Sequence, residues 1–349
     1  MYNLKNTCCQ AAINSFLLTM FDTISNKKGT TQNSLTGKSM RVIHKLLWNC
    51  WCATIPLLGK TFPVLATKLQ YQVKLKRPIN LNNPILMTEK MQWLKLYLYS
   101  DNPIITQCVD KYKVREFITK RGCPEILNEL IAAYDKVDDI NWDKLPNKFV
   151  IKCNHGCGYN IICTDKKIFD IDNANKLLGE WMKTEYGLNS VELIYHNIPR
   201  KIICEKYIET ENGVSPNDYK IFCSYGVPKL IYVISGGHNN QEYLDYYTPD
   251  WKWIPVQNGN LPNAGDIHKK PGNLNELLSY ASTLSKGFPI VRVDLYDEFK
   301  KVIFGEMTFL ATGGMPNYKP NTYDLLFGRM FPLYETKSSK AIWIRKFQY

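Results

Sequence analysis

The chain has 349 residues, 45% of them hydrophobic, so it can bury a core in two or three compact units and is not an intrinsically disordered protein. Forty-four Lys and Arg residues against 32 Asp and Glu residues give a formal charge of +12. That charge favours anionic partners such as nucleotides, acidic polysaccharides or phospholipid head groups. No stretch reaches the ~18 uninterrupted apolar residues of a membrane-spanning helix, so we expect none.

Residues 1–70 are expected to form an N-terminal extension in two pieces joined by a polar run, without a secretory signal. Residues 42–66 combine tryptophans, leucines and nearby basic residues. This pattern fits either a buried helix or a helix lying on an anionic membrane surface. Throughout the chain, eleven irregularly spaced cysteines favour a reducing cytoplasm over a disulfide framework.

Residues 71–145 are expected to be mainly helical. Thr88 is predicted to cap one helix, and a second helix, beginning near Ile104, is predicted to carry Lys111. By spacing alone, Lys111 fits either a solvated helix lysine or a ligand contact.

Residues 147–163 are predicted to form a hairpin in which an apolar strand delivers Lys152 to a glycine-containing turn. Such a turn can wrap a phosphate with its backbone N–H groups while the lysine supplies positive charge. Zinc is the alternative, because Cys153, His155 and Cys157 alternate along the chain. A structural zinc site would also need a fourth ligand, and none is evident.

The middle of the chain is predicted to hold a helix, three strands and a second helix. They are expected at residues 173–186, 201–204, 218–223, 229–234 and 273–284. Asp218 and Lys220 share one face of their strand because side chains alternate along a strand.

Residues 290–314 are the most informative stretch, since alternating apolar side chains predict two strands around a polar turn. Paired strands lie about 5 Å apart, so the hairpin would bring Asp294 close to Glu306. Arg292 and Thr308 would lie beside them. Facing carboxylates repel unless a cation lies between them, and Mg²⁺ that also holds substrate phosphates fits such a site. The alternative is a surface hairpin with solvated charges.

Seven segments, in this order, resemble the ATP-grasp superfamily, and within it the TupA-like group associated with bacterial cell-surface polysaccharide and teichuronopeptide synthesis. They are RPINLNNP from Arg77, TEKMQWLKLY from Thr88, DKYKVREF from Asp110, LPNKFVIKCNHG from Leu145, DYKIFC from Asp218, LSKGFPIVRVDLY from Leu284 and FGEMTF from Phe304. So many ordered matches are more specific than any single one.

This resemblance, over about residues 77–332, implies an α+β ATP-grasp fold in which two α+β lobes clamp ATP, with a helical N-terminal extension. The divisions it implies are residues 1–70 for the extension, 71–145 for a helical lead-in, 146–204 for the N-terminal lobe with the phosphate loop, 205–335 for the C-terminal lobe with the Mg²⁺ site, and 336–349 for a tail.

The resemblance also implies roles for single residues. Those that would bind ATP are Lys111, Lys152, His155, Gly156, Gly158, Asn160, Glu205, Tyr207, Glu209 and Asp218. Within this group the lysines would contact the phosphates and the adenine side, residues 155–160 would cover the phosphates, Glu205 and the backbone near Tyr207 would meet adenine, and Glu209 or Asp218 would lie near the ribose.

The remaining residues would serve the metal and the reaction. Asp294 and Glu306 would hold Mg²⁺, with Thr308 at a third position that is usually Asn in the family. Arg292 would stabilise negative charge at the transferring phosphoryl group, and Lys220 would lie near the phosphates or the acyl group.

The implied activity is ATP-dependent carboxylate–amine ligation through an acyl phosphate, attaching an amino acid or amine to a uronic acid or acidic glycan in the cytoplasm or at the inner face of the membrane. The alternatives are an ATP-grasp kinase for a sugar hydroxyl and a non-catalytic polysaccharide-assembly protein. Nucleic-acid binding is not expected, because the basic residues are scattered and no recognised module is present.

Overall fold

The computed structural model describes residues 51, 54–210, 217–236 and 242–333. The chain divides into two compact units, residues 1–78 with 188–191, and residues 79–187 with 192–349. Most of the expected N-terminal extension and the expected tail at residues 336–349 lie outside the described residues. No helix among the described residues is long and apolar enough to cross a membrane.

The first unit contains helix α3 (Pro63–Leu75), which begins with proline at its first position, where the missing N–H costs no helical hydrogen bond. Its small core joins Trp51, Ile55 and Ala66 to Val191. The part of the expected amphipathic segment that is described, residues 51 and 54–66, therefore contributes buried side chains to this unit.

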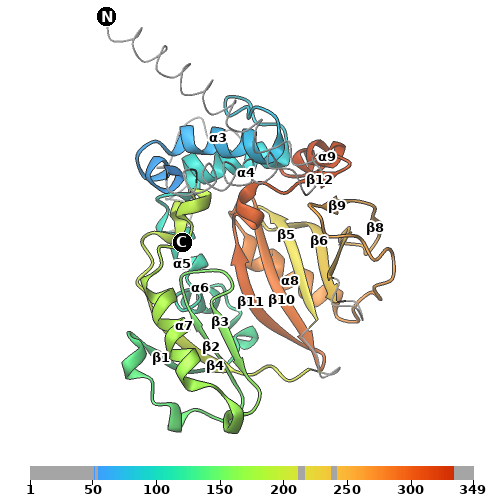
Figure 1. Cartoon of the computed structure of the whole chain (residues 1–349). Coiled ribbons are helices and arrows are strands. Elements are labelled where there is room, and N and C mark those ends of the chain that lie inside the picture. The colour runs from blue at the N-terminus through green and yellow to red at the C-terminus, as the bar shows by residue number, and fades with distance from the viewer. Residues whose placement is uncertain (1–50, 52–53, 211–216, 237–241, 334–349) are drawn as a thin grey trace, which may run out of the picture. The chain divides into compact units, whose positions relative to one another are not determined.

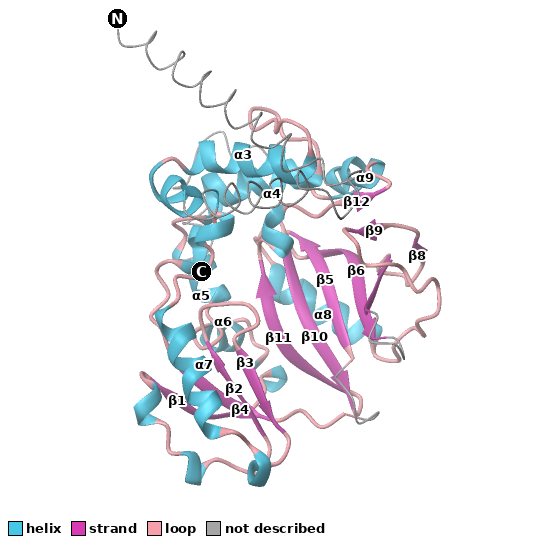
Figure 2. Cartoon of the chain, viewed as in Figure 1, coloured by secondary structure: helices cyan, strands magenta, loops and turns pink. Residues whose placement is uncertain are grey.

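The second unit contains two large antiparallel sheets and one of two short strands, together with helices, an α+β arrangement (Figures 1 and 2). The four-stranded sheet has the order β1-β4-β2-β3. Its strands are β1 (Leu130–Tyr134), β2 (Phe149–Cys153), β3 (Asn160–Cys163) and β4 (Ile202–Lys206). Helix α7 (Ile171–Lys183) packs Leu178 into the core of this sheet.

Strand β1 lies in the segment that we expected to be helical. Its five residues are a short run of mostly apolar side chains, which periodicity alone cannot assign to a helix or a strand. Its pairing partner β4 follows about 70 residues later, with Tyr134 opposite Ile202. The partner that makes this segment a strand is therefore not visible in the local sequence.

The six-stranded sheet has the order β11-β10-β5-β6-β7-β8. Its strands are β5 (Asp218–Ser224), β6 (Val227–Gly236), β7 (Glu242–Tyr247), β8 (Trp253–Ile254), β10 (Val291–Glu298) and β11 (Lys301–Thr308). Helix α8 (Leu274–Ser285) covers one face, where its Leu277 joins Val291 and Val293 in the core. Because side chains alternate along β10, Arg292 and Asp294 lie on the opposite face.

The remaining elements join the two sheets or lie near the ends of the second unit. They are α4 (Met87–Leu94), which continues into a π-helical turn (Lys95–Tyr99), α5 (Pro103–Val109), α6 (Val114–Lys120), α9 (Thr322–Met330), and the short paired strands β9 (Gln257–Asn258) and β12 (Tyr318–Lys319). Short 3₁₀ turns lie at Pro124–Ile126, Val137–Asp139, Trp142–Lys144, Lys166–Ile168, Leu193–Tyr195 and Ala311–Gly314 in this unit, and at Leu188–Ser190 in the first.

Two expectations about the lead-in helices are wrong. Thr88 lies inside α4 rather than at its cap, and its hydroxyl donates to Asp324 at 2.7 Å. The start of α4 is held instead by Glu89, which accepts backbone N–H bonds from Ile85 and Leu86. Lys111 lies outside any helix, because the backbone turns extended at Asp110 after α5 ends.

Candidate active site

The predicted hairpin is present as strands β10 and β11, which turn at Phe299 and Lys300 with left-handed backbone at both residues. Asp294 pairs with Glu306, and Arg292 pairs with Thr308. The register shifts directly after Asp294, so a bulge follows the pair of carboxylates. The hairpin's geometry is therefore confirmed, with the four expected side chains on one face.

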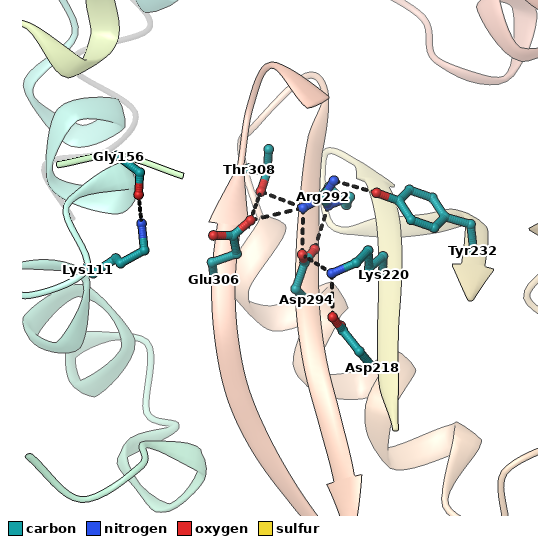
Figure 3. Close-up of polar contacts among 9 residues, drawn as sticks. All are labelled: Lys111, Gly156, Asp218, Lys220, Tyr232, Arg292, Asp294, Glu306 and Thr308. Atoms are coloured by element: carbon teal, nitrogen blue, oxygen red, sulfur yellow. Dashed lines mark hydrogen bonds and ion pairs between the residues drawn. The ribbon is translucent and has the colours of Figure 1, made fainter. Parts of the chain in front are cut away.

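Arg292 supplies the cation that the facing carboxylates require. Its Nε and Nη2 atoms each donate to Asp294 at 2.6 Å, in the two-pronged geometry that favours Arg over Lys. Nη2 also lies 3.0 Å from Glu306 Oε1 and 2.9 Å from Thr308 Oγ1 (Figure 3). Burial opposes the charge of Arg292, yet Asp294 raises its pKa well above the ordinary value.

Strand β5 adds Asp218 and Lys220 to the same face. Lys220 Nζ lies 2.5 Å from Asp218 Oδ2 and 2.8 Å from Asp294 Oδ2 (Figure 3). Burial, together with the charge of Asp294, raises the pKa of Asp218 to about 6. We call Asp218, Lys220, Arg292, Asp294 and Glu306 the acid–base cluster.

Glu306 is the residue of the acid–base cluster that faces Lys111, which lies outside the six-stranded sheet. Burial alone would raise its pKa, but the charges of Arg292 and Lys111 outweigh burial and hold the pKa at about 2. Both of its short hydrogen bonds, from Arg292 and from the Thr308 hydroxyl at 2.8 Å, go to Oε1. In Figure 3 its other oxygen points towards Lys111.

Lys111 is held at the edge of the glycine turn. Its backbone N–H donates to Asn154 O at 3.1 Å, and its Nζ donates to the carbonyl of Gly156. Burial lowers the pKa of Lys111, while the negative charge of Glu306 opposes that change. A lysine that is distant from the hairpin in sequence thus interacts electrostatically with Glu306 of the acid–base cluster.

Lys152 projects from β2 and forms an ion pair with Glu205 of β4 at 2.6 Å. Arg115 Nη1 lies 3.5 Å from the other oxygen of Glu205. We call Lys111, Lys152, Arg115 and Glu205 the lysine side. It carries three cations for one carboxylate, an excess of positive charge suited to polyanions.

The glycine turn, residues 154–159, is held by an aromatic stack. Tyr159 stacks on Trp181 of α7 with ring centroids 5.2 Å apart. His155 is buried, and its Nε2 lies 3.0 Å from Trp181 O, while burial lowers its pKa. Gly158 has φ of 74° and open space around it, whereas a Cβ on Gly156 would meet the Tyr159 ring at 2.5 Å.

The zinc alternative for this turn is wrong. Cys153 is buried in β2, and His155 is bonded to a carbonyl. Within residues 51, 54–210, 217–236 and 242–333, no three His, Cys, Asp or Glu side chains form a group that could hold a metal ion. The alternation along the chain arises from a strand running into a turn.

The other predicted residues lie near the end of β4 or at the start of β3. Glu209 is exposed and pairs with Lys148 at 2.7 Å, and the Lys148 ammonium lies 5.6 Å from the Tyr207 ring centre. Asn160 is exposed and pairs with Lys152 in the β2–β3 ladder. Glu209 thus lies with Lys148 and Tyr207, whereas Asp218, the other residue suggested for the ribose, belongs to the acid–base cluster.

A cavity of about 320 Å³ lies between the hairpin and the glycine turn. Arg292, Glu306 and Thr308 line one side, and Lys111 and Gly156 line the other. Thr312 and Gly313 also border it, in a turn where both have left-handed backbone. The cavity thus brings together groups of both charges from distant parts of the sequence.

The family follows from comparison with known proteins. The TupA-like ATP-grasp family model matches residues 89–332. The chain belongs to this family. Comparison with curated proteins finds no match.

Solved structures of two ligases and a synthetase resemble this TupA-like protein at low identity. D-alanine–D-alanine ligase from Bacillus anthracis complexed with ATP is 15% identical, with a TM-score of 0.40 over 69% of this chain and 68% of that one. L-amino acid ligase from Bacillus licheniformis is 13% identical, with a TM-score of 0.37 over 73% and 59%. N5-carboxyaminoimidazole ribonucleotide synthetase from Thermus thermophilus is 11% identical, with a TM-score of 0.36 over 64% and 51%.

Three residues of this TupA-like site gave no signal in the sequence. Tyr232 accepts a 2.6 Å hydrogen bond from Arg292, Arg115 flanks Glu205, and buried Asn154 donates to Asp110 at 2.8 Å. Only the order of strands β10-β5-β6 brings Tyr232 to the cluster. A search for every polar side chain that alternates with apolar ones along a predicted strand would have found Tyr232, but only among many other residues.

Proposed function

We propose that this protein is an ATP-dependent carboxylate–amine ligase that works through an acyl phosphate, joining an amino acid or amine to a uronic acid or acidic glycan in bacterial surface polysaccharide synthesis. Membership of the TupA-like ATP-grasp family supports ATP as the substrate. The observation that carries the proposal is the cavity between the acid–base cluster and Lys111. There, a phosphoryl group can meet the cationic side chains of Lys111 and Arg292 beside the carboxylate of Glu306.

The donor set at the hairpin fits Mg²⁺. Asp294 and Glu306 supply oxygen ligands on facing strands, and Glu306 stays ionised because its pKa is held at about 2. Arg292 bridges the two carboxylates, so a bound Mg²⁺ would compete with it for their oxygens. We assign Asp294 and Glu306 as the metal ligands and Thr308 as a weaker third ligand. The ion would neutralise charge on the transferring phosphoryl group.

We assign ATP binding to the lysine side and the segments around it. Lys111 and Lys152 would balance phosphate charge, and the turn with His155, Gly156, Gly158 and Asn160 would lie over the phosphates. Glu205 would meet adenine, and its ion pair with Lys152 supports a second role in fixing that lysine. Tyr207 and Glu209 follow β4 and would lie along the nucleoside.

The proposed reaction has two steps. A carboxylate oxygen of the acid attacks the γ-phosphorus of ATP, ADP leaves, and an acyl phosphate forms. The amine nitrogen then attacks the acyl carbon, phosphate leaves, and the nitrogen loses a proton to give an amide. The protein's share would be to position the groups and to stabilise charge. We assign charge stabilisation to Arg292 and Lys220, which both form ion pairs with Asp294.

The test combines binding with trapping. Calorimetry with a non-hydrolysable ATP analogue and Mg²⁺ should show binding that Lys152→Ala and Glu306→Ala both weaken, while the exposed Lys136→Ala matches wild type. Hydroxylamine should then convert the acyl phosphate to a hydroxamate when the correct acid is present. ADP release without hydroxamate for every carboxylate tried would overturn ligation, and a phosphorylated glycan in the mass spectrum would replace it with the kinase.

We also propose a cytoplasmic location with contact at the inner membrane face. The support is the charge of +12 and the tryptophan- and leucine-rich residues 42–66. Sedimentation with anionic liposomes that is lost when residues 1–70 are deleted would agree with this proposal. Equal sedimentation of both chains would contradict it.

A further inference from the structure

We propose that Tyr232 is a positioning residue for Arg292: its hydroxyl fixes the orientation in which the guanidinium faces the cavity. The proposal rests on the ligase function proposed above and adds a residue that neither the sequence nor the family match assigns.

The hydrogen bonds of Arg292 divide between its two edges. Nε and Nη2 point to Asp294, and Nη2 also reaches Glu306 and Thr308. Nη1 donates to the Tyr232 hydroxyl at 2.6 Å (Figure 3). The guanidinium carbon also lies 5.5 Å from the centre of the Tyr232 ring. Tyr232 therefore restrains Nη1, while the acidic side chains accept hydrogen bonds from Nε and Nη2.

The partners of Arg292 differ in charge, and this difference gives Tyr232 its role. Asp294 and Glu306 are the metal ligands in the proposed function, so a bound cation would compete with Arg292 for their oxygens. The Tyr232 hydroxyl is neutral, since burial raises its pKa to about 12. Its bond to Nη1 can therefore persist while the bonds to the carboxylates change.

The Tyr232 ring is itself held firmly. It is buried on β6, opposite Lys220 in the ladder. Phe222 and Tyr246 pack against it with ring centroids 5.7 and 5.5 Å away. Tyr246 uses its own hydroxyl to accept a bond from Asn258 at 3.3 Å. Tyr246→Phe is thus a matched control, with the same loss of one buried hydroxyl one ring further from Arg292.

The kinetic test compares Tyr232→Phe with Tyr246→Phe. We expect Tyr232→Phe to lower kcat for hydroxamate formation roughly 10- to 100-fold, because small displacements of a catalytic group are costly. The KM for ATP should stay within about twofold, and Tyr246→Phe should keep the wild-type kcat. Equal kcat values for Tyr232→Phe and wild type, or equal losses in both variants, would overturn the proposal.

A second measurement needs no turnover. In protein labelled with ¹⁵N-arginine and free of nucleotide, the side-chain signals of Arg292 are assigned by their loss in Arg292→Lys. Wild type and Tyr246→Phe should show two separate proton signals on Nη1, and Tyr232→Phe should show one averaged Nη1 proton signal because rotation about Cζ–Nη1 is no longer restrained. Unchanged signals in Tyr232→Phe would overturn the proposal, whereas a wild type that forms no hydroxamate would overturn the ligase function alone.

Discussion

The acid–base cluster and the lysine side have opposite balances of charge. The cluster takes its members from three adjacent strands, and its three carboxylates outnumber its two cations. The lysine side assembles a loop lysine, a helix arginine and two strand residues, with three cations for one carboxylate. A region short of cations beside a region rich in them suits a polyanion that binds together with a metal ion.

The largest expected effect tests whether Arg292 stabilises the acid–base cluster by neutralising its facing carboxylates. Arg292→Met leaves Asp294 and Glu306 facing each other, so we expect the free energy of unfolding at pH 7 to fall by about 3–5 kcal/mol. Lys152→Met should cost about 1 kcal/mol, because Arg115 still faces Glu205 and the pair is partly exposed. Urea unfolding followed by tryptophan fluorescence measures both. Equal losses would remove the distinction between the two regions.

A second expected effect concerns pH and Asp218. Its carboxyl keeps a proton up to about pH 6 in the folded protein but only to about pH 4 when unfolded. Protonated Asp218 therefore stabilises the fold at low pH, and this contribution is lost as pH rises from about 4 to about 6, by up to ~1.4 kcal/mol per pH unit. Above that window it stays constant.

The check for Asp218 is the difference in unfolding free energy between wild type and Asp218→Asn at pH 4, 5, 6 and 7. The unfolding free energy of wild type minus that of Asp218→Asn should fall from pH 4 to pH 6 and then level off. Glu209→Gln, at an exposed carboxylate, serves as the reference. A difference that grows with pH would show that Lys220 dominates over burial and Asp294.

The smallest expected effect compares two glycines of the glycine turn. Gly156→Ala places a methyl group against the Tyr159 ring, which is wedged on Trp181, so we expect a loss of about 1–3 kcal/mol. Gly158→Ala meets no atom and costs about 1 kcal/mol for its left-handed backbone. The midpoint temperature of thermal unfolding should be lower for Gly156→Ala than for Gly158→Ala. The reverse order would mean that Tyr159 moves freely and that the turn is not held by its aromatic stack.

Much of the fold could be predicted where the signal was local. The β10–β11 hairpin follows from alternation and turn residues, and so does the β2–β3 hairpin. Prediction failed where a long-range partner decides the structure: β1 is a strand because it pairs with β4, and Thr88 is not a cap because it bonds Asp324. Lys111 lies outside its predicted helix because the Asp110 carboxylate accepts backbone N–H bonds from Tyr112 and Lys113, which ends the helix before Lys111.

The sequence by itself determined that Arg292 shares a face with Asp294, and Glu306 with Thr308, because side chains alternate along a strand. The bulge after Asp294 decided that these two pairs face each other, since the register set by the turn would pair Asp294 with Gly305. The tertiary structure decided what stands beside them. Lys220 and Tyr232 reach Arg292 and Asp294 because β5 and β6 add to β10 from more than 50 residues earlier in the chain. Hydrogen-bonded strand order depends on the packing of the whole sheet, and no local periodicity encodes it.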